Sequence, residues 1–390
     1  MPPPSSSLPP ALAAFLQRVT LQTRRHRLLA PLLALALARF VYHRRRRHLD
    51  QLRLHRVITK QLALDFDPCM RDGSAPLTPM AAPMEEWHVV SDDGTQAASL
   101  VYYPTEEPAN ASEKVLVLLI PGNPGVPHYY LPLMQELVAR HGRRHEVRCL
   151  SHASHFMPWK NNGRTYSLQE QLDQKAHYLK MRLHEDPKLR FVVIGHSIGS
   201  FFVLDIARRF PHQIAKLVLM QPTIMHMAQS AKGQQMMPLF RNYERSVAAV
   251  TLLEYLVPMA LRRWIVRQAV GVETSDILQL ASLSLVNASV MRNCLAMALN
   301  EMEDVKELDE ALVAQHEHKT LFVYSPVDDW VPAEFVQEYQ LRFPKAQHRV
   351  VPQPHAFMME RDGTRDMAAH ISRWIGDVLD DKQVRPPVWV

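Results

Sequence analysis

The chain has 390 residues, 47% of them hydrophobic, which is enough to bury a large core in one big domain or two ordinary ones. Its net charge of +6 is misleading, because residues 1–49 contain nine arginines and no acid, while the remaining 36 basic residues nearly balance the 39 acidic ones. This distribution does not indicate a nucleic-acid-binding body, and three scattered cysteines (Cys69, Cys149 and Cys294) argue against a disulfide framework or a structural zinc site.

The first 60 residues form a basic and hydrophobic segment that we interpret as a targeting or membrane-anchoring arm. Residues 1–10 are rich in proline and serine, which predicts disorder. The uncharged stretch 28–38 lies between the basic runs 24–27 and 44–47. As a helix this stretch is about 16 Å long, roughly half the hydrocarbon thickness of a bilayer, so we expect a poor membrane-spanning helix.

The favoured interpretation of this arm is an anchor on a membrane or lipid-droplet surface, with arginines reaching the headgroup phosphates. The alternative is a mitochondrial or plastid transit peptide, which is also rich in arginine and free of acids. A secretory signal is disfavoured, because four arginines follow the apolar stretch so closely.

Residues 61–220 and 320–385 show the alternation of strands and helices that is typical of an α/β domain. An antiparallel hairpin is predicted at residues 85–91 and 98–103. Continuous apolar runs indicate strands of a parallel sheet that is buried on both faces; they lie at residues 115–120, 191–194, 217–220 and 321–324. Helical patterns lie at residues 130–140, 168–183 and 202–210. We therefore predict an α/β fold with a mostly parallel sheet and helices on both faces.

The alternation is interrupted at residues 221–319, where the pattern is helical and no strand is recognisable. We interpret this stretch as a helical cap inserted over the carboxyl edge of the sheet. Nine of the nineteen methionines lie between Met220 and Met302. Methionine-rich surfaces can adapt to irregular apolar ligands, although for any single methionine an ordinary place in a helix core is the better explanation.

Residues 195–199 read G-x-S-x-G and directly follow the apolar run 191–194, which is the context of a nucleophile elbow. Ser197 would occupy a strained turn, and bulkier residues in place of Gly195 or Gly199 would clash. The turn raises the serine hydroxyl to the end of the sheet, in front of a helix N-terminus. The motif alone does not distinguish a nucleophile from a helix-capping serine. The distinction depends on whether the chain also supplies a base and an acid for Ser197.

A nucleophilic serine needs a base within hydrogen-bond reach and a carboxylate that orients this base, and on an α/β sheet they follow in the order Ser, acid, His. Two acids, Asp328 and Asp329, lie in the loop after the fourth apolar strand. We prefer Asp328, because Asp-x-x-x-Pro is the usual spacing there and Asp329 can cap the helix that starts near Pro332. His355 is the predicted base, since it follows a short strand and two prolines stiffen its loop.

The predicted oxyanion hole consists of the backbone N–H groups of Ile198 and Asn123. Ile198 follows the nucleophile directly. Asn123 lies in the loop 121–125 after the first apolar strand, where two glycines allow the backbone to approach a ligand closely.

Three other histidines lie near these motifs. His196 is predicted to pack under the elbow rather than to act in catalysis, and the roles of His152 and His155 stay open between pocket lining and loop structure. The sequence contains no H-E-x-x-H motif and no zinc-deaminase motif, so metal-dependent hydrolysis loses support and no cofactor is expected.

Taken together, these motifs resemble the lipid droplet-associated hydrolase family over residues 116–357, in the expected order. The segments that carry the resemblance are I-P-G-N-P-G at 120–125, Y-S-L-Q-E-Q at 166–171, G-H-S-I-G at 195–199, D-D-W at 328–330 and H-A-F at 355–357. The resemblance implies an α/β-hydrolase fold with Ser197, Asp328 and His355 as nucleophile, acid and base. It also implies lipid esters, including sterol esters, as substrates, and residence on lipid droplets or the endoplasmic reticulum membrane.

The function that these predictions favour is that of a serine hydrolase cleaving lipid carboxylic esters at a droplet or membrane surface. Its expected partners are the lipid ester and the surface that the N-terminal segment contacts, and no nucleic acid. The alternative is a lipid-surface binding or scaffolding protein whose site is intact but nearly idle. A third hypothesis is transfer of the acyl group to an alcohol instead of water.

Overall fold

The structure, a computed structural model, describes residues 29–64, 82–105, 114–157, 161, 164–271 and 274–380. The predicted disorder of residues 1–10 and the predicted end of the core, residues 381–385, lie outside this part of the chain. Contacts divide the chain into two compact units, Met1–Arg53 and Leu54–Val390. Within the described residues, no helix combines the length and the apolar character that crossing a bilayer requires.

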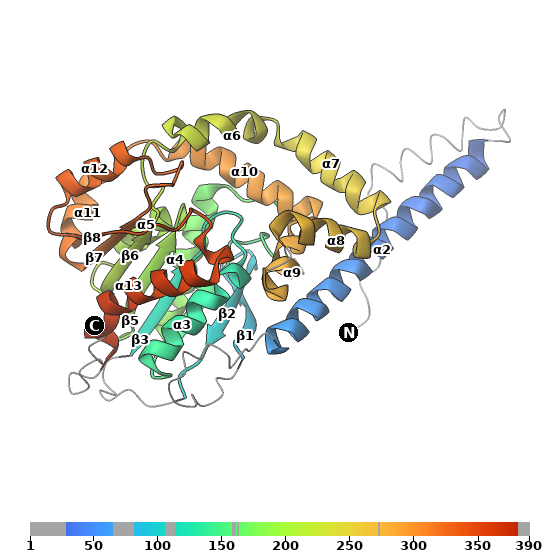
Figure 1. The fold of residues 1–390 in the computed structure, drawn as a ribbon. Helices are drawn as coiled ribbons and strands as arrows, with labels where there is room; N and C mark the ends of the chain where they lie inside the picture. The colour runs from blue at the N-terminus through green and yellow to red at the C-terminus, as the bar shows by residue number, and fades with distance from the viewer. Residues whose placement is uncertain are drawn as a thin grey trace. The chain divides into compact units, whose positions relative to one another are not determined.

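An eight-stranded sheet lies at the centre of the larger unit, in the order β1-β2-β4-β3-β5-β6-β7-β8 (Figure 1). Its strands are β1 (Met84–Val89), β2 (Gln96–Tyr102), β3 (Val115–Ile120), β4 (Glu146–Leu150), β5 (Arg190–His196), β6 (Ile214–Met220), β7 (Thr320–Tyr324) and β8 (Gln347–Val350). The pairs β1–β2 and β2–β4 are antiparallel, and all pairs from β4 to β8 are parallel. The predicted hairpin and the predicted parallel strands are thus confirmed.

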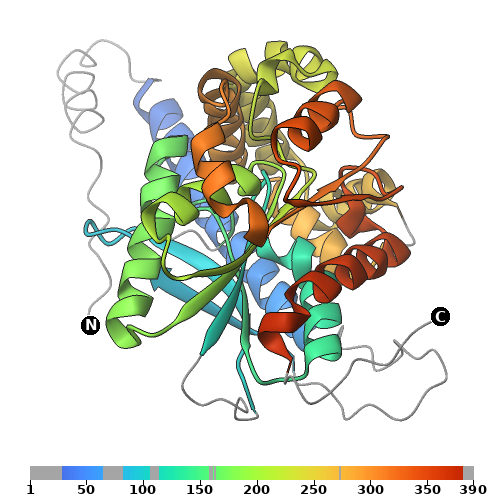
Figure 2. The same ribbon diagram turned by 90° about the vertical axis from the view of Figure 1, so that its left-hand side faces the viewer.

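Helices cover both faces of this sheet, which explains why its central strands are apolar without alternation. Successive side chains of β3 enter two different apolar clusters: Val115, Val117 and Leu119 join one, and Leu116, Leu118 and Ile120 the other. Figure 2 shows α3 and α13 on one side and α4 on the other. The helices of the two layers are α3 (Leu131–His141) and α13 (Arg361–Leu379) on one face, and α4 (Leu168–Glu185), α5 (Gly199–Arg209), α11 (Glu310–His316) and α12 (Ala333–Arg342) on the other.

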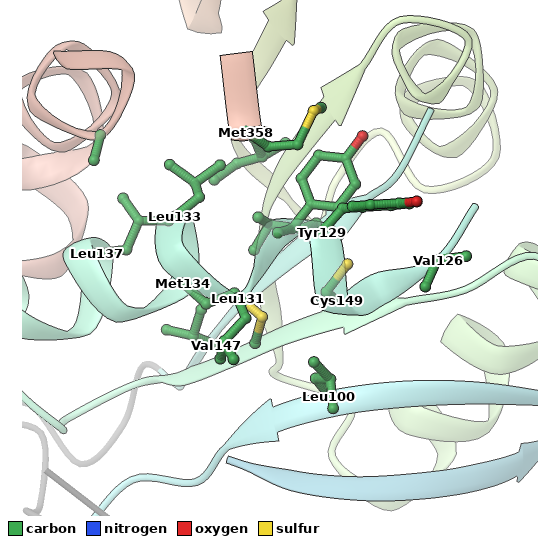
Figure 3. Close-up of a cluster of buried hydrophobic side chains, with 14 of the residues drawn as sticks. Leu100, Val126, Tyr129, Leu131, Leu133, Met134, Leu137, Val147, Cys149 and Met358 are labelled. Atoms are coloured by element: carbon green, nitrogen blue, oxygen red, sulfur yellow. The ribbon is translucent and has the colours of Figure 1, made fainter. Parts of the chain in front are cut away.

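The face under α3 is a dense apolar layer, part of which is drawn in Figure 3. The short helix η2 (Pro127–Tyr130) and α3 direct Tyr129, Leu131 and Met134 toward it, where they join Cys149 of β4 in one buried cluster. This layer fixes the start of α3, and therefore the position of the loop that connects β3 to η2.

Helix α2 (Leu29–Leu64) extends well beyond the predicted apolar stretch, and its last part belongs to the larger unit. Leu54, Ile58 and Leu62 follow each other at intervals of four residues, so they share one helix face, and all three are buried in the core. The prediction places the boundary of the arm at residue 60, later in the chain than the division by contacts. The division falls after Arg53, because this apolar face binds the end of the helix to the core.

The described residues of 221–319 contain no strand. Five of their helices make up a cap between β6 and β7 (Figure 1): α6 (Ala231–Arg241), α7 (Tyr243–Leu256), α8 (Met259–Val270), α9 (Asp276–Ser284) and α10 (Ala288–Asp304). The prediction extends the cap to residue 319, and α11 within this range packs against α5, with Leu312 and Val313 in the same buried cluster. Parallel strands need a crossover, and α11 belongs to the connection between β6 and β7.

Candidate active site

Ser197 lies on the sharp turn between β5 and α5, with a backbone φ of 54°. This left-handed conformation is costly for a residue with a side chain, and two glycines make room for it. A Cβ at Gly195 would overlap the carbonyl oxygen of Gly199, and a Cβ at Gly199 would overlap that of Ile120. The turn itself is held because the Ser197 N–H donates to Met220 O on the neighbouring strand at 2.9 Å.

Ser197, His355 and Asp328 come together at the carboxyl edge of the sheet. His355 Nε2 lies 3.0 Å from Ser197 Oγ, and His355 Nδ1 lies 2.8 Å from Asp328 Oδ2. Because a carboxylate only accepts, Nδ1 carries the proton and Nε2 is free to accept from the serine hydroxyl. The other oxygen of Asp328, Oδ1, accepts from the N–H of Trp330 at 2.9 Å. Asp328 is buried and Asp329 is exposed, so of the two acids Asp328 is the one that reaches the imidazole.

Two buried side chains hold the loop that carries His355. Gln221 Nε2 donates to the carbonyl oxygens of Gln353 at 3.2 Å and Pro354 at 2.9 Å. His196 Nε2 donates to the carbonyl oxygen of His355 itself at 2.9 Å. The imidazole therefore stands on a loop whose backbone is tied at three consecutive residues.

His196 also connects this loop to the loop after β3. Burial, with a smaller contribution from His355, lowers the pKa of His196 well below its usual value, so the ring is neutral. Since Nε2 donates, Nδ1 must accept, and it does so from the hydroxyl of Tyr130 at 2.7 Å. Tyr130 Oη in turn accepts from the N–H of Gly122 at 2.9 Å. His196 packs under the elbow as predicted, but the sequence did not reveal that it links the two loops.

The loop 121–125 approaches the elbow closely. A Cβ on Gly122 would lie 2.9 Å from Ser197 Cβ, so a glycine is needed there. The N–H groups of Asn123 and Ile198, the predicted oxyanion donors, donate to no acceptor within the described residues. Both therefore stay available to a bound oxyanion.

His152 and His155 support this loop through hydrogen bonds to its backbone. His152 Nε2 donates to Pro121 O at 3.1 Å, and His155 Nδ1 donates to Pro124 O at 3.0 Å. Both rings are buried, and burial lowers the pKa of His155 to about 3, so it stays neutral. The sequence signal for this role was ambiguous. It consists of two histidines shortly after the strand β4, which pairs with β3, and this position is compatible with pocket lining as well as with loop support.

Helix α10 of the cap binds the side chain of Asn123. Asn123 Nδ2 donates to Cys294 O at 2.8 Å and to Glu301 Oε1 at 2.9 Å. Glu301 is only 2% exposed, and burial raises its pKa to about 8. Its carboxyl group is therefore largely protonated near neutral pH. Nothing in the local sequence of α10 indicated this contact.

We expect the buried carboxyl of Glu301 to make folding pH-dependent. Its pKa in the folded chain lies above its usual value of 4.5, so the stability that the proton contributes is complete below pH 4.5 and is lost as pH rises through about 8. The neighbouring Cys294 thiol stays neutral over this range, because burial raises its pKa as well. Glu301→Gln, which carries a permanently neutral amide, should therefore gain stability relative to the wild type as pH rises.

Urea unfolding at about pH 5 and about pH 9 measures this difference. Glu303→Gln, an exposed position on the same helix, serves as the control and should follow the wild type at both pH values. Unfolding midpoints of the wild type and Glu301→Gln that stay a constant distance apart would contradict a titrating Glu301.

Within the described part of the chain, no three His, Cys, Asp or Glu side chains gather in a way that could hold a metal ion. The reactive groups of this edge are thus a hydroxyl, an imidazole, a carboxylate and two backbone N–H donors. Such an arrangement can transfer an acyl group through a serine.

Solved structures with this architecture include a bacterial membrane phospholipase A, with a TM-score of 0.56 and 17% identity over 91% of this chain and 99% of that one. A thioesterase domain from the curacin biosynthetic pathway has a TM-score of 0.52 and 16% identity, over 74% of this chain and 99% of its own. At these identities the likeness shows the fold alone, and it confirms the α/β-hydrolase fold.

The family model for lipid-droplet associated hydrolases matches residues 113–358. The lipid droplet-associated hydrolases of Gallus gallus and Homo sapiens are 31% and 30% identical to this chain, over 68% and 69% of it and over 86% and 84% of those proteins. The protein of that name from Dictyostelium discoideum is 25% identical, over 72% of this chain and 93% of its own. The chain therefore belongs to the lipid droplet-associated hydrolase family.

Proposed function

We propose that this protein is a serine ester hydrolase that cleaves lipid carboxylic esters, sterol esters among them, at the surface of lipid droplets or of the endoplasmic reticulum membrane. The observation that carries the proposal is the hydrogen-bonded series Ser197–His355–Asp328, with distances of 3.0 and 2.8 Å. The names of the relatives support lipid substrates and a droplet surface.

In the proposed reaction, Ser197 Oγ attacks the ester carbonyl carbon while His355 Nε2 takes the hydroxyl proton. Asp328 stabilises the imidazolium through its Nδ1–H. The N–H groups of Asn123 and Ile198 donate to the oxyanion of the tetrahedral intermediate. When the intermediate collapses, His355 returns the proton to the departing alcohol and an acyl-serine remains. Water, deprotonated by the same imidazole, then attacks the acyl-serine. The bond between the acyl carbon and Ser197 Oγ breaks, His355 returns the proton to Oγ, and the acid is released.

A panel of esters offered to the full-length protein in detergent micelles tests the reaction type. The panel holds a p-nitrophenyl butyrate, a triacylglycerol, a sterol ester and a phospholipid, with and without an added alcohol. We expect free acid from at least one lipid ester. A folded protein that binds lipid but releases no acid would favour the scaffolding alternative, and a new ester formed with the added alcohol would favour acyl transfer.

For the N-terminal arm, we expect that deleting residues 1–49 releases the protein from membranes or droplets without unfolding it. The truncation keeps Leu54, Ile58 and Leu62 in the core, and it keeps the 2.6 Å hydrogen bond between His55 and Glu85. The lost part contains the arginines that attract anionic headgroups.

Flotation of the truncated protein with phospholipid vesicles and droplets, beside thermal unfolding, measures both effects. If the truncated protein binds as well as the full chain, the part that contacts the lipid surface is the cap instead. Its side chains Leu256, Trp264 and Ile265 are 63%, 59% and 42% exposed. A mature N-terminus near residue 50 in cells would instead identify the arm as a transit peptide.

A further inference from the structure

One face of α10 docks the cap onto the core beside the candidate site. Asn293 and Asn300 are seven residues apart, so they lie two turns apart on the same face. Asn293 Oδ1 accepts from the N–H of Tyr166 at 3.2 Å, and Asn300 Oδ1 accepts from the N–H of Leu168 at 3.3 Å. These bonds attach α10 to the start of α4, and they leave the neighbouring positions of the helix facing the loop after β3.

Those neighbouring positions are Cys294 and Glu301, again two turns apart, and both bind Asn123. The two hydrogens of the Asn123 amide group are divided between them, at 2.8 Å to the Cys294 carbonyl and 2.9 Å to the Glu301 carboxyl. Gly122 is held by the core through Tyr130, and Pro124 O accepts from His155 of the core at 3.0 Å and from the Cys294 thiol of α10 at 3.6 Å. The cap thus contacts the loop at Asn123 through two hydrogen bonds and at Pro124 through the longer thiol contact.

We propose that Glu301 is a positioning residue, which acts through Asn123 to orient the backbone N–H that receives the oxyanion. The inference rests on the proposed function and adds to it a role for the cap in the chemical step. An oxyanion donor acts only if it is already aimed at the developing charge, and a shift of about 1 Å can cost on the order of 100-fold in rate. The side-chain nitrogen of Asn123 is held by two acceptors, and these two hydrogen bonds restrain the backbone of the same residue.

The contact requires an acceptor oxygen at position 301, which a neutral side chain can also supply. Glu301 is buried beside the Cys294 thiol, and no cation contacts its carboxyl group within the described residues. Glutamine presents a carbonyl oxygen on a side chain of the same shape, so Glu301→Gln can keep the bond. Glu301→Leu fills the same space but offers no acceptor. Comparing Glu301→Gln with Glu301→Leu therefore separates the effect of the lost hydrogen bond from the effect of altered packing.

The test uses the full-length protein in detergent micelles, with p-nitrophenyl butyrate as substrate and a fluorophosphonate probe that reacts with the serine. For Glu301→Leu we expect kcat and the labelling rate to fall about 10- to 100-fold with little change in KM, because the donor acts on the transition state. Glu301→Gln should retain activity within about threefold of the wild type. Glu303→Gln, exposed on the same helix, should match the wild type.

Asn123→Ala removes the donor of the same hydrogen bonds and keeps the backbone N–H of residue 123. It therefore replaces Glu301→Leu in the test if that variant does not fold. The double variant should be no slower than the slower single variant, because both remove one interaction. Losses that multiply, a Glu301→Leu protein as fast as the wild type, or a Glu301→Gln protein as slow as Glu301→Leu would each overturn the inference. A wild type that never reacts with the probe would overturn the proposed function as well.

Discussion

Ser197→Ala should abolish both ester hydrolysis and labelling by a fluorophosphonate probe, with a loss in kcat of at least about 10⁴-fold. The alanine removes the hydroxyl oxygen that lies 3.0 Å from His355 Nε2, and with it the attacking atom of the proposed reaction. The fold should tolerate the change. Alanine occupies the same left-handed backbone conformation at equal cost, and the lost hydrogen bond contributes about 1 kcal/mol.

Ser246→Ala on α7 provides the matched control, because this serine lies on a cap helix that carries none of the proposed site residues. Its labelling and turnover should equal those of the wild type. Thermal unfolding of both variants establishes that each is folded. Residual labelling of Ser197→Ala at the wild-type rate would place the reactive group elsewhere in the protein, and the proposed mechanism would then be wrong.

Asp328→Asn should lower kcat by about 10³- to 10⁴-fold, while Asp329→Asn leaves it within about twofold. An asparagine at position 328 presents its amide hydrogens to His355 Nδ1, which moves the ring proton to Nε2. The imidazole then faces the hydroxyl of Ser197 with a proton and cannot act as base. The side chain at position 329 is exposed, and His355 Nδ1 is hydrogen-bonded to Asp328 instead. Substituting Asp329 should therefore not affect the imidazole.

The two variants change neighbouring positions, and each removes one negative charge. General effects on solubility or net charge are therefore the same in both. Hydrolysis of p-nitrophenyl butyrate over a range of concentrations separates kcat from KM. Because Asp328 acts on the imidazole, KM should change little. Equal losses in the two variants, or a larger loss in Asp329→Asn, would mean that the acid has been assigned to the wrong residue.

The two proposals about the site and the cap have different consequences for the enzyme. Substitution of Ser197 or Asp328 removes a group that handles the reacting atoms or the proton. Substitution of Glu301 leaves every such group in place and changes only the support of one N–H donor. The expected losses therefore fall in the order Ser197, Asp328, Glu301, and a reversed order would show that the cap contact has another function.

Much of the fold could be predicted because the relevant rules are local. The apolar run at residues 115–120 had to be a strand buried on both faces, and the structure confirms it as β3. The glycines around Ser197 were predicted from steric demand alone, and both positions leave no space for a Cβ. The order Ser, acid, His along the chain is the usual one on such a sheet, and parallel strands can bring the three loops together because their carboxyl ends share one edge.

The limits of prediction appear where neighbours in sequence have different neighbours in space. Asp328 and Asp329 are chemically identical, and the loop geometry after β7 turns one inward to His355 and the other to solvent. The boundaries of the arm and the cap depend on contacts of the same kind. The last turns of α2 and the pair Leu312 and Val313 of α11 are short apolar faces, and their assignment depends on which layer they cover.

Periodicity and the steric space at glycine were thus readable from the amino acids, since each acts within a few residues. The partners of buried polar groups were not. Tyr130 meets His196 across 66 positions and Asn123 meets Glu301 across 178, and such bonds form only after the layers have packed. A buried donor must find an acceptor somewhere, but which one it finds depends on the segments that packing brings beside it.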